Sequence, residues 1–302
     1  MRSGCASGVC SPLGLDEFKR SRSCFTHDAL VEMATSWNKL ATRKSPINTA
    51  LTTGRLRAKL RQLLGPDEGQ WISKVGGMSQ NAKAALMVMP QKPRDWIKQP
   101  NKWLNNYDIN HILTRFEGDT HYPYKLLGVF PMDFQGKDEA GQPLYTEMHN
   151  FQLSRYADKY RFLGMITNLD HHEGSGSHWT STFIVMDPSM ASFGAYYYDS
   201  TFTPRTDASR VPPEIRTFFK LLKRQAAELY PSAKPFKNVF YKLSHQKGNT
   251  ECGMFSIFYQ VHWLRSLINN IATTHKDIIT LKITDDQVFK LRDFFFRPPP
   301  KI

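Results

Sequence analysis

The order of sequence patterns along these 302 residues predicts an α+β fold. Apolar side chains in roughly the first 90 residues recur at the spacing of one helix face, which indicates helices. Four short runs of β-branched and aromatic residues follow, each bounded by turn-forming residues. Segments with helix start and stop signals accompany these runs, so a sheet with flanking helices is expected in the second part of the chain.

The chain is expected to divide into an N-terminal helical arm region, residues 1–95, and a larger domain, residues 96–302. In the arm region, Thr26 precedes an apolar stripe as a helix N-cap, and a second stripe of leucines ends at Gly65. Prolines at positions 90, 93 and 100 interrupt the pattern between the two parts. They predict a linker or a crossover.

In the larger domain, the four candidate strands cover residues 161–167, 178–186, 193–198 and 238–243. An amphipathic helix lies between the last two strands, with a proline-led start at Pro212-Pro213-Glu214 and an end at Pro231. The residues after Cys252 are apolar on nearly every face, as in a central buried helix. Thr284 and Gln287 form a capping box that opens a last helix, which runs through residue 295 and stops before residue 298.

The chain is strongly basic, with a formal net charge of +13 and a pI near 9.5, which favours polyanionic partners. The densest basic stretch contains Arg55, Arg57, Lys59 and Arg61 between leucines at helical spacing. Two interpretations stay open: a solvated helix face, or a face that contacts nucleic acid.

No apolar run is long enough for a membrane span, and the first residues lack the apolar stretch of a signal peptide. A soluble protein in a reducing, intracellular compartment is therefore expected. The four cysteines are a poor disulfide framework for a chain of this length, because three fall within the first 24 residues. The start of the chain, with Cys5, Cys10 and Cys24, is expected to be disordered or loosely packed, and pairing among these cysteines stays open as an alternative.

A lone cysteine, Cys252, opens the apolar helix six residues after Gln246. Unpaired N–H groups and the helix dipole favour a thiolate at such a position, so the thiol is suited to act as a nucleophile. The side-chain amide of Gln246 is suited to donate to the oxyanion that forms on attack. A buried structural cysteine produces the same local pattern, so the functional interpretation depends on partners elsewhere in the chain.

A predicted hairpin supplies these partners. His178 follows a Gly-Ser loop and opens a strand, and a tight turn from Asp187 to Met190 leads into the next strand. If Asp187 pairs with Met190, His178 lies directly opposite Asp199 on one face of the ladder. Asp199 can then orient the imidazole while the other ring nitrogen faces the thiol. A shift of one residue would separate the two side chains, and a surface histidine beside a turn-capping aspartate is the alternative.

Other histidines fit this chemistry poorly. His262 lies ten residues after Cys252 on the same predicted helix, about 15 Å along its axis, which is too far for proton transfer. His171 and His172 lack the paired Cys and His spacing of a zinc site, and so do the N-terminal cysteines. No metal site is therefore expected.

The order His178-Trp179, Asp199, and Gln246 to Cys252-Gly253 resembles the Ulp1/adenain clan of cysteine proteases. The stretch from Trp103 to residue 109 is similar to the Trp-Leu-Asn-Asp motif that opens the Ulp1 catalytic domain. The resemblance implies a mixed central sheet flanked by helices, with the nucleophile at the start of a buried helix. It also implies that Trp103 and Trp179 line a narrow tunnel for a Gly-Gly substrate backbone.

A more specific resemblance is to the polyprotein-processing proteases of African swine fever virus and related large DNA viruses. Residues 131–134, 168–179, 250–253 and 283–297 carry it, together with a short helical arm ahead of the catalytic domain. The African swine fever enzyme has Asn at the third triad position, whereas this chain has Asp199, in agreement with the wider clan. The resemblance covers residues 96–297 well and the arm only loosely.

This resemblance implies a cysteine endopeptidase that cuts viral structural polyproteins after Gly-Gly during virion maturation, in the host cytoplasm and the virion. No cofactor is expected, although adenain-type proteases are stimulated by DNA, so nucleic acid is a second expected partner besides the Gly-Gly-Xaa substrate. Three alternatives stay open: a SUMO- or ubiquitin-like deconjugating isopeptidase with the same site, an acyltransferase of this superfold, and a basic nucleic-acid-binding virion protein. The sequence does not indicate an oligomeric state.

Overall fold

The computed structural model describes residues 9–40, 46–75, 82–117, 123–201, 211–240, 245–268 and 280–298. The chain forms two compact units. Unit 1 comprises Met1–Lys98 together with Asp293–Ile302, and unit 2 comprises Gln99–Arg292. The last residues of the chain thus belong to unit 1. The expected division into residues 1–95 and 96–302 had placed them in the second part.

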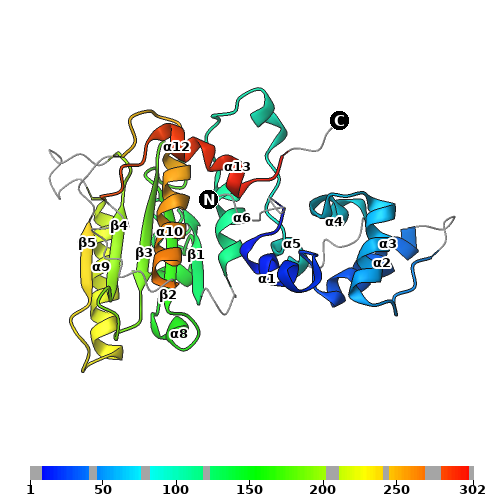
Figure 1. Cartoon of the computed structure of the whole chain (residues 1–302). Helices are drawn as coiled ribbons and strands as arrows, with labels where there is room; N and C mark the ends of the chain where they lie inside the picture. The colour runs from blue at the N-terminus through cyan, green and yellow to red at the C-terminus, as the bar shows by residue number, and fades with distance from the viewer. Residues whose placement is uncertain are drawn as a thin grey trace. The chain divides into compact units, whose positions relative to one another are not determined.

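Unit 1 is helical where the structure describes it (Figure 1). Its helices are α1 (Pro12–Ser21), α2 (His27–Leu40), α3 (Thr53–Leu64), η1 (Glu68–Gln70), α4 (Trp71–Lys74), α5 (Ala82–Leu86) and η3 (Arg94–Ile97). The predicted N-cap of α2 is confirmed, since the Thr26 hydroxyl accepts from the Ala29 N–H at 3.3 Å. The stop of α3 at Gly65 is confirmed as well, because Gly65 has a φ of 96°, a value that favours glycine.

From residue 9 onward, the first part of unit 1 is packed into a core, contrary to expectation. Cys10 and Cys24 form a disulfide with a Cα–Cα distance of 5.2 Å, and both side chains are buried in the unit's apolar core. The expectation of a loosely packed start is therefore wrong from residue 9 onward, because α1 turns the chain back and brings the two cysteines together. Cys5 lies outside the described residues.

The C-terminal strand-like stretch completes unit 1 through backbone contacts. Arg297 donates its backbone N–H to Pro90 O at 2.8 Å, and the Lys92 N–H donates to Arg297 O at 2.9 Å. The Arg297 Nε also donates to Met89 O at 2.6 Å. These contacts join residues more than 200 positions apart, which no local sequence pattern can show.

Unit 2 contains a mixed five-stranded sheet, in the order β1-β2-β3-β4-β5 (Figure 1). The strands are β1 (Tyr124–Phe130), β2 (Phe162–Asn168), β3 (Trp179–Val185), β4 (Gly194–Tyr198) and β5 (Lys237–Phe240). The outer pairs β1–β2 and β4–β5 are parallel, and the inner pairs are antiparallel. This confirms the predicted α+β class with a mixed sheet. Residues 241–243 of the fourth predicted strand lie outside the described residues.

Strand β1 was not predicted. Its register against β2 shifts between Leu126 and Gly128, so one residue of β1 is left without a partner. Gly128 has a φ of 154°, and the bulge breaks the alternation by which a strand is recognised in a sequence.

Helices cover both faces of the sheet. On β4, Tyr198 stacks on Tyr259 of α10 (Cys252–Ile268), with the ring centroids 4.4 Å apart. The next side chain along the strand, Tyr197, lies instead in the apolar cluster that contains Phe218 of α9 (Pro213–Leu229). Successive strand residues point to opposite faces, so α9 and α10 lie on opposite sides of the sheet. This explains why every residue of β2, β3 and β4 is buried.

The other elements of unit 2 are short. They are α6 (Asn106–Leu113), η4 (Thr114–Phe116), α7 (Thr146–His149), α8 (Ser154–Ala157) and α12 (Asp285–Lys290). The predicted capping box of the last helix is confirmed, with Thr284 and Gln287 bonded reciprocally. The single helix expected there is interrupted at Leu291, however, and α13 (Arg292–Phe295) begins after it.

Candidate active site

The thiol of Cys252 lies at the first residue of α10, and the residue is 2% exposed. Polar contacts hold this helix against β3: Gln260 donates to Ser181 Oγ at 2.8 Å and to Thr182 O at 2.7 Å. Space beside the residue after the thiol is limited, because a Cβ on Gly253 would lie 3.1 Å from the Leu104 Cβ. The Cys-Gly pair therefore starts a helix whose first turn lies close against its neighbours.

His178 and Asp199 lie at adjacent strand ends, and His178 Nε2 is 2.8 Å from Asp199 Oδ1. The predicted register was nevertheless wrong. Ser181 pairs with Tyr198, so the ladder extended by one pair would place Asp199 opposite Thr180 rather than opposite His178. The connection between the strands is longer than the four-residue turn assumed, which shifts the pairing by two residues. A shift of two leaves both side chains on the same face, so they still meet.

The two groups stabilise each other's charged form. Burial by itself lowers the pKa of His178, but side-chain hydrogen bonds with Asp199 and Cys252, together with the charges of both groups, raise it to about 9. Burial by itself raises the pKa of Asp199, but the hydrogen bond and charge of His178 and two hydrogen bonds from Thr201 lower it below its usual value. An imidazolium paired with the Asp199 carboxylate is therefore the favoured state of His178 at neutral pH.

Two residues that directly follow Asp199 also belong to the site, although no sequence motif predicted them. Thr201 donates to Asp199 Oδ1 from its backbone N–H at 2.8 Å and from its hydroxyl at 2.9 Å. Ser200 is buried, and its hydroxyl donates to Gln246 Oε1 at 2.7 Å. The only local signal was the run of small hydroxyl residues directly after the aspartate, a common feature of turns.

Gln246 is held in a defined orientation beside the start of α10. It is 5% exposed, and its backbone N–H donates to Ser200 O at 2.9 Å. The Ser200 hydroxyl donates to Oε1, which fixes this atom as the amide oxygen and leaves Nε2 as the donor. Nε2 donates one of its two hydrogens to Gly248 O at 2.9 Å. The amide that was predicted to donate to an oxyanion is thus fixed by neighbours on both sides.

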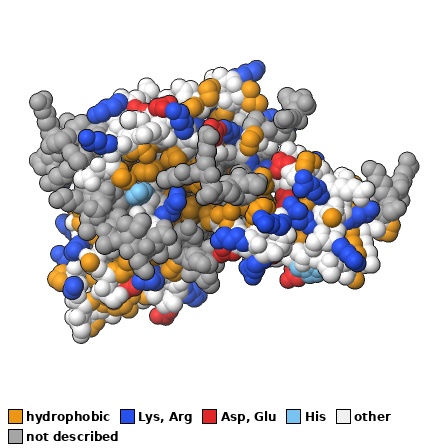
Figure 2. All heavy atoms as spheres, viewed as in Figure 1, with side chains coloured by type: hydrophobic (Ala, Val, Ile, Leu, Met, Phe, Trp, Pro, Cys, Tyr) orange, Lys and Arg blue, Asp and Glu red, His pale blue; other side chains and the backbone are white. Residues whose placement is uncertain are grey.

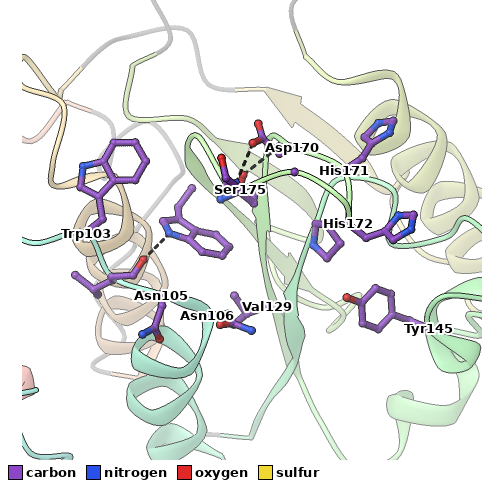
Figure 3. A pocket seen from close by; sticks show the side chains of 15 residues that line it. Trp103, Asn105, Asn106, Val129, Tyr145, Asp170, His171, His172 and Ser175 are labelled. Carbon is purple, nitrogen blue, oxygen red and sulfur yellow. Dashed lines mark hydrogen bonds between the residues drawn. The ribbon is translucent and has the colours of Figure 1, made fainter.

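Trp103 and Trp179 both line a pocket of about 430 Å³ in unit 2. Trp179 is buried and donates from Nε1 to Leu104 O at 2.8 Å, whereas Trp103 is 41% exposed. Trp103 lies at one end of this pocket, and His172 and Tyr145 lie at the other (Figure 3). The indole that follows His178 is therefore anchored, and the other indole is accessible to a substrate.

The four basic residues suggested for polyanion binding differ in their surroundings. Arg55 and Arg61 are exposed on α3, and Lys59 Nζ lies 3.3 Å from Gln62 Oε1. Arg57 instead donates from Nε to Glu68 Oε1 at 2.6 Å, and Glu68 is buried. Arg57 thus has a structural partner inside unit 1.

The net charge is concentrated in unit 1, which has 18 of the 40 Lys and Arg residues but only 8 of the 27 Asp and Glu residues. Unit 2 is nearly balanced, with 22 basic and 19 acidic residues. Figure 2 shows Lys and Arg side chains on the surface around α2 and α3. This asymmetry concerns the whole unit rather than the four residues of α3 alone.

Within the described ranges, no group of three or more His, Cys, Asp or Glu side chains is arranged to hold a metal ion. The helices in the same ranges include none with the length and apolar character needed to cross a membrane.

Comparisons with known proteins define the class. No family model matches the chain. The fold is similar to that of the crystal structure of an African swine fever virus protease, with a TM-score of 0.53 and 17% identity over 92% of both chains. In fold and in sequence the chain is thus similar to viral cysteine proteases, the class that its motifs indicated.

Two proteins are similar to the chain in sequence. A SUMO-1 cysteine protease of African swine fever virus, isolate Pig/Kenya/KEN-50/1950, is 29% identical over 135 residues. That match covers 44% of this chain and 43% of the relative, so the chain spans less than half the length of the African swine fever proteins it matches. A putative thiol protease of Acanthamoeba polyphaga mimivirus is 23% identical over an alignment of 317 residues, which covers 97% of this chain and 94% of the relative.

Proposed function

We propose that the chain is a cysteine endopeptidase that cleaves viral structural polyproteins after Gly-Gly, with Cys252, His178 and Asp199 as its triad. One observation carries the proposal. His178 lies between the carboxylate of Asp199, 2.8 Å away, and the thiol at the start of α10, and these partners raise its pKa to about 9. Burial alone would do the opposite, so the surroundings of His178 are built to favour an imidazolium.

In the proposed reaction, the Cys252 thiolate attacks the scissile carbonyl, and the carbonyl oxygen takes up negative charge. The Gln246 amide and the Cys252 backbone N–H donate to this oxyanion. His178 then gives its proton to the leaving amine, the C–N bond breaks, and the acyl group stays on sulfur. Water, deprotonated by His178, adds to the thioester, and the carboxylic acid leaves as the thiolate re-forms beside the protonated His178.

The Gly-Gly preference is supported by the pocket that contains both tryptophans. Trp179 is fixed by its bond to Leu104 O, and Trp103 precedes that residue in the chain. A backbone that passes between two indoles has little room for side chains, and glycine supplies a backbone without them. A substrate with Gly-Gly before the scissile bond meets this condition.

Cleavage of a Gly-Gly-Xaa peptide tests the assignment. Cys252→Ser and His178→Ala should each lower kcat by a factor of about 10³ or more, because the nucleophile or its base is removed. Retained cleavage in either variant refutes the triad. Ala-Ala-Xaa is the matched control peptide, and equal cleavage of both peptides refutes the Gly-Gly preference. Cleavage of a SUMO fusion but not of the peptide would favour the deconjugating isopeptidase instead.

A second candidate function, polyanion binding by unit 1, is favoured by the concentration of net charge there. Arg55, Lys59 and Arg61 are the side chains to replace with Gln. Arg57 is excluded, because its bond to Glu68 would make loss of binding indistinguishable from loss of folding. The triple variant should bind DNA more weakly and with a smaller salt dependence, and unchanged binding would exclude this face. Comparing the peptide cleavage rates of both proteins with and without DNA tests stimulation.

The viral relatives also support a place of action in the host cytoplasm and in the virion. Fractionation of infected cells and of purified virions, followed by immunoblotting, tests this location. Absence from both fractions would refute it.

A further inference from the structure

We propose that Asp285 and Arg292, in the C-terminal segment formed by residues 284–292, are positioning residues that hold the nucleophile loop in its reactive shape. The nucleophile loop is defined here as residues 246–251, which connect the Gln246 amide to the Cys252 thiol. The proposal rests on the proposed function, because that function makes both groups part of the reaction. All the contacts lie within unit 2.

Asp285 holds the first half of this loop. Its carboxylate accepts the backbone N–H of Gly248 at 2.7 Å and that of Lys247 at 3.0 Å. Gly248 O is the acceptor for Gln246 Nε2. The carboxylate therefore fixes the same peptide segment whose carbonyl aligns the Gln246 amide. The capping box of Thr284 and Gln287 starts α12 at Asp285, which keeps this carboxylate in place.

Arg292 holds the second half of the loop. It donates to Glu251 from Nε at 3.1 Å and from Nη2 at 3.2 Å, and both side chains are almost fully buried, at 3% and 5% exposure. Glu251 directly precedes Cys252 in the chain. Burial lowers the pKa of Arg292 and raises that of Glu251, so each group depends on the other to stay charged.

Arg292 also connects the nucleophile loop to the tryptophan pocket. Its Nη1 donates to Lys102 O at 2.8 Å, and Lys102 precedes Trp103. On the other side of Trp103, Leu104 O accepts from Trp179 Nε1. The Arg292 guanidinium thus fixes the position of Glu251, the residue before Cys252, relative to the segment that carries Trp103. A lysine cannot make this set of three bonds, because its ammonium lacks the planar fork.

The break between α12 and α13 has a role in this arrangement. Asp285 and Arg292 are seven residues apart, and the interruption at Leu291 separates the two short helices to which they belong. The two side chains contact the loop near its opposite ends, at residues 247–248 and at residue 251. A loop held at both ends keeps the amide and the thiol at a fixed separation, which the attack on a carbonyl requires.

The experiment compares Asp285→Asn and Arg292→Lys with the matched control Asp286→Asn. Asp286 is on the same helix turn, but it is exposed and pairs only with the exposed Lys290 among the contacts described. Activity is measured on a Gly-Gly-Xaa peptide and is normalised to the concentration of folded protein, taken from the amplitude of its thermal unfolding transition, so that unfolded protein does not contribute. The rate of Cys252 alkylation by iodoacetamide is measured separately.

Asp285→Asn is expected to lower kcat about tenfold or more with KM within about twofold, because the amide is misplaced in the transition state. Arg292→Lys is expected to lower kcat and raise KM, since it affects both the thiol and the Trp103 segment, and to slow alkylation. Asp286→Asn should match the wild type in all three quantities.

Normalised kcat values equal to the control in both variants would overturn the proposal, even if the melting temperature falls, because that result means a purely structural role. If Arg292→Lys does not fold, Asp285→Asn decides alone. If the wild type does not cleave the peptide, the proposed function fails and the alkylation rates still decide the positioning role. Equal rates in Arg292→Lys and Asp286→Asn then refute it.

Discussion

Replacing Asp199 by Asn should move the alkaline limit of activity to lower pH. Asn keeps an oxygen that accepts from His178 but removes the negative charge. The pKa of His178 rises from 6.5 to about 9 in the folded protein, which corresponds to about 3 kcal/mol of preference for the imidazolium. Asp199 is one of the two groups that produce this rise. Losing an opposite charge at this distance shifts a pKa by about 1–3 units, so we expect a shift of at least about one pH unit.

The assay is the pH profile of kcat/KM on a Gly-Gly-Xaa peptide. Its alkaline limb reports loss of the proton that His178 must give to the leaving amine. Asp187→Asn is the control, because Asp187 forms its ion pair with Arg161 at 2.6 Å, away from the site, and should leave the limb unchanged. An alkaline limb in Asp199→Asn that coincides with that of the wild type would refute the assignment of Asp199.

The same pair also predicts how stability depends on pH. The raised pKa of His178 means that its contribution is complete below pH 6.5 and is lost as the pH rises through about 9. The lowered pKa of Asp199 means that its contribution is present above pH 3.8 and is lost as the pH falls through the folded-state value. The difference in melting temperature between wild type and Asp199→Asn should therefore be largest near pH 5 to 6 and shrink toward pH 9 and above.

Two further predictions concern packing. Glu68→Ala should lower the free energy of unfolding by about 3 kcal/mol, measured with urea, because it leaves the Arg57 guanidinium without its buried carboxylate. The kcat of the folded fraction should stay unchanged, and a stability equal to that of the wild type contradicts the prediction. Gly253→Ala should cost about 1–3 kcal/mol and lower kcat, since its Cβ would lie 3.1 Å from the Leu104 Cβ and 3.3 Å from the Trp179 Cδ1. A melting temperature and a kcat equal to those of the wild type would contradict this prediction, because they would show that the first turn of α10 can shift to accommodate the methyl group.

The hairpin at the site illustrates how far sequence reasoning extends. The prediction that His178 and Asp199 share a face needed only the parity of their positions on neighbouring strands, because strand side chains alternate with a period of two. The predicted pairing was wrong by two residues, and the contact survived because two is one full period. Parity is a local property, whereas the length of a connection depends on how the turn packs.

Other features of the structure were not predicted from the sequence, and each has a physical reason. Strand β1 contains a bulge at Gly128, which removes the alternation that a strand prediction uses. The disulfide of Cys10 and Cys24 depends on the path of α1, and cysteine spacing alone does not specify pairing. Ser200 orients Gln246 from 46 positions away, across a gap that no periodic pattern spans.

The sequence by itself indicated the class of this protein, the order of its elements apart from β1 and the short helices, and the pairing of His178 with Asp199. These depend on periodicity, caps and short motifs, which are local. Only the tertiary structure decided that Thr201 holds Asp199, that Ser200 orients Gln246, and that Asp285 and Arg292 support the loop before Cys252. The reason is that hydrogen bonds and burial act between side chains brought together by folding, whatever their separation along the chain.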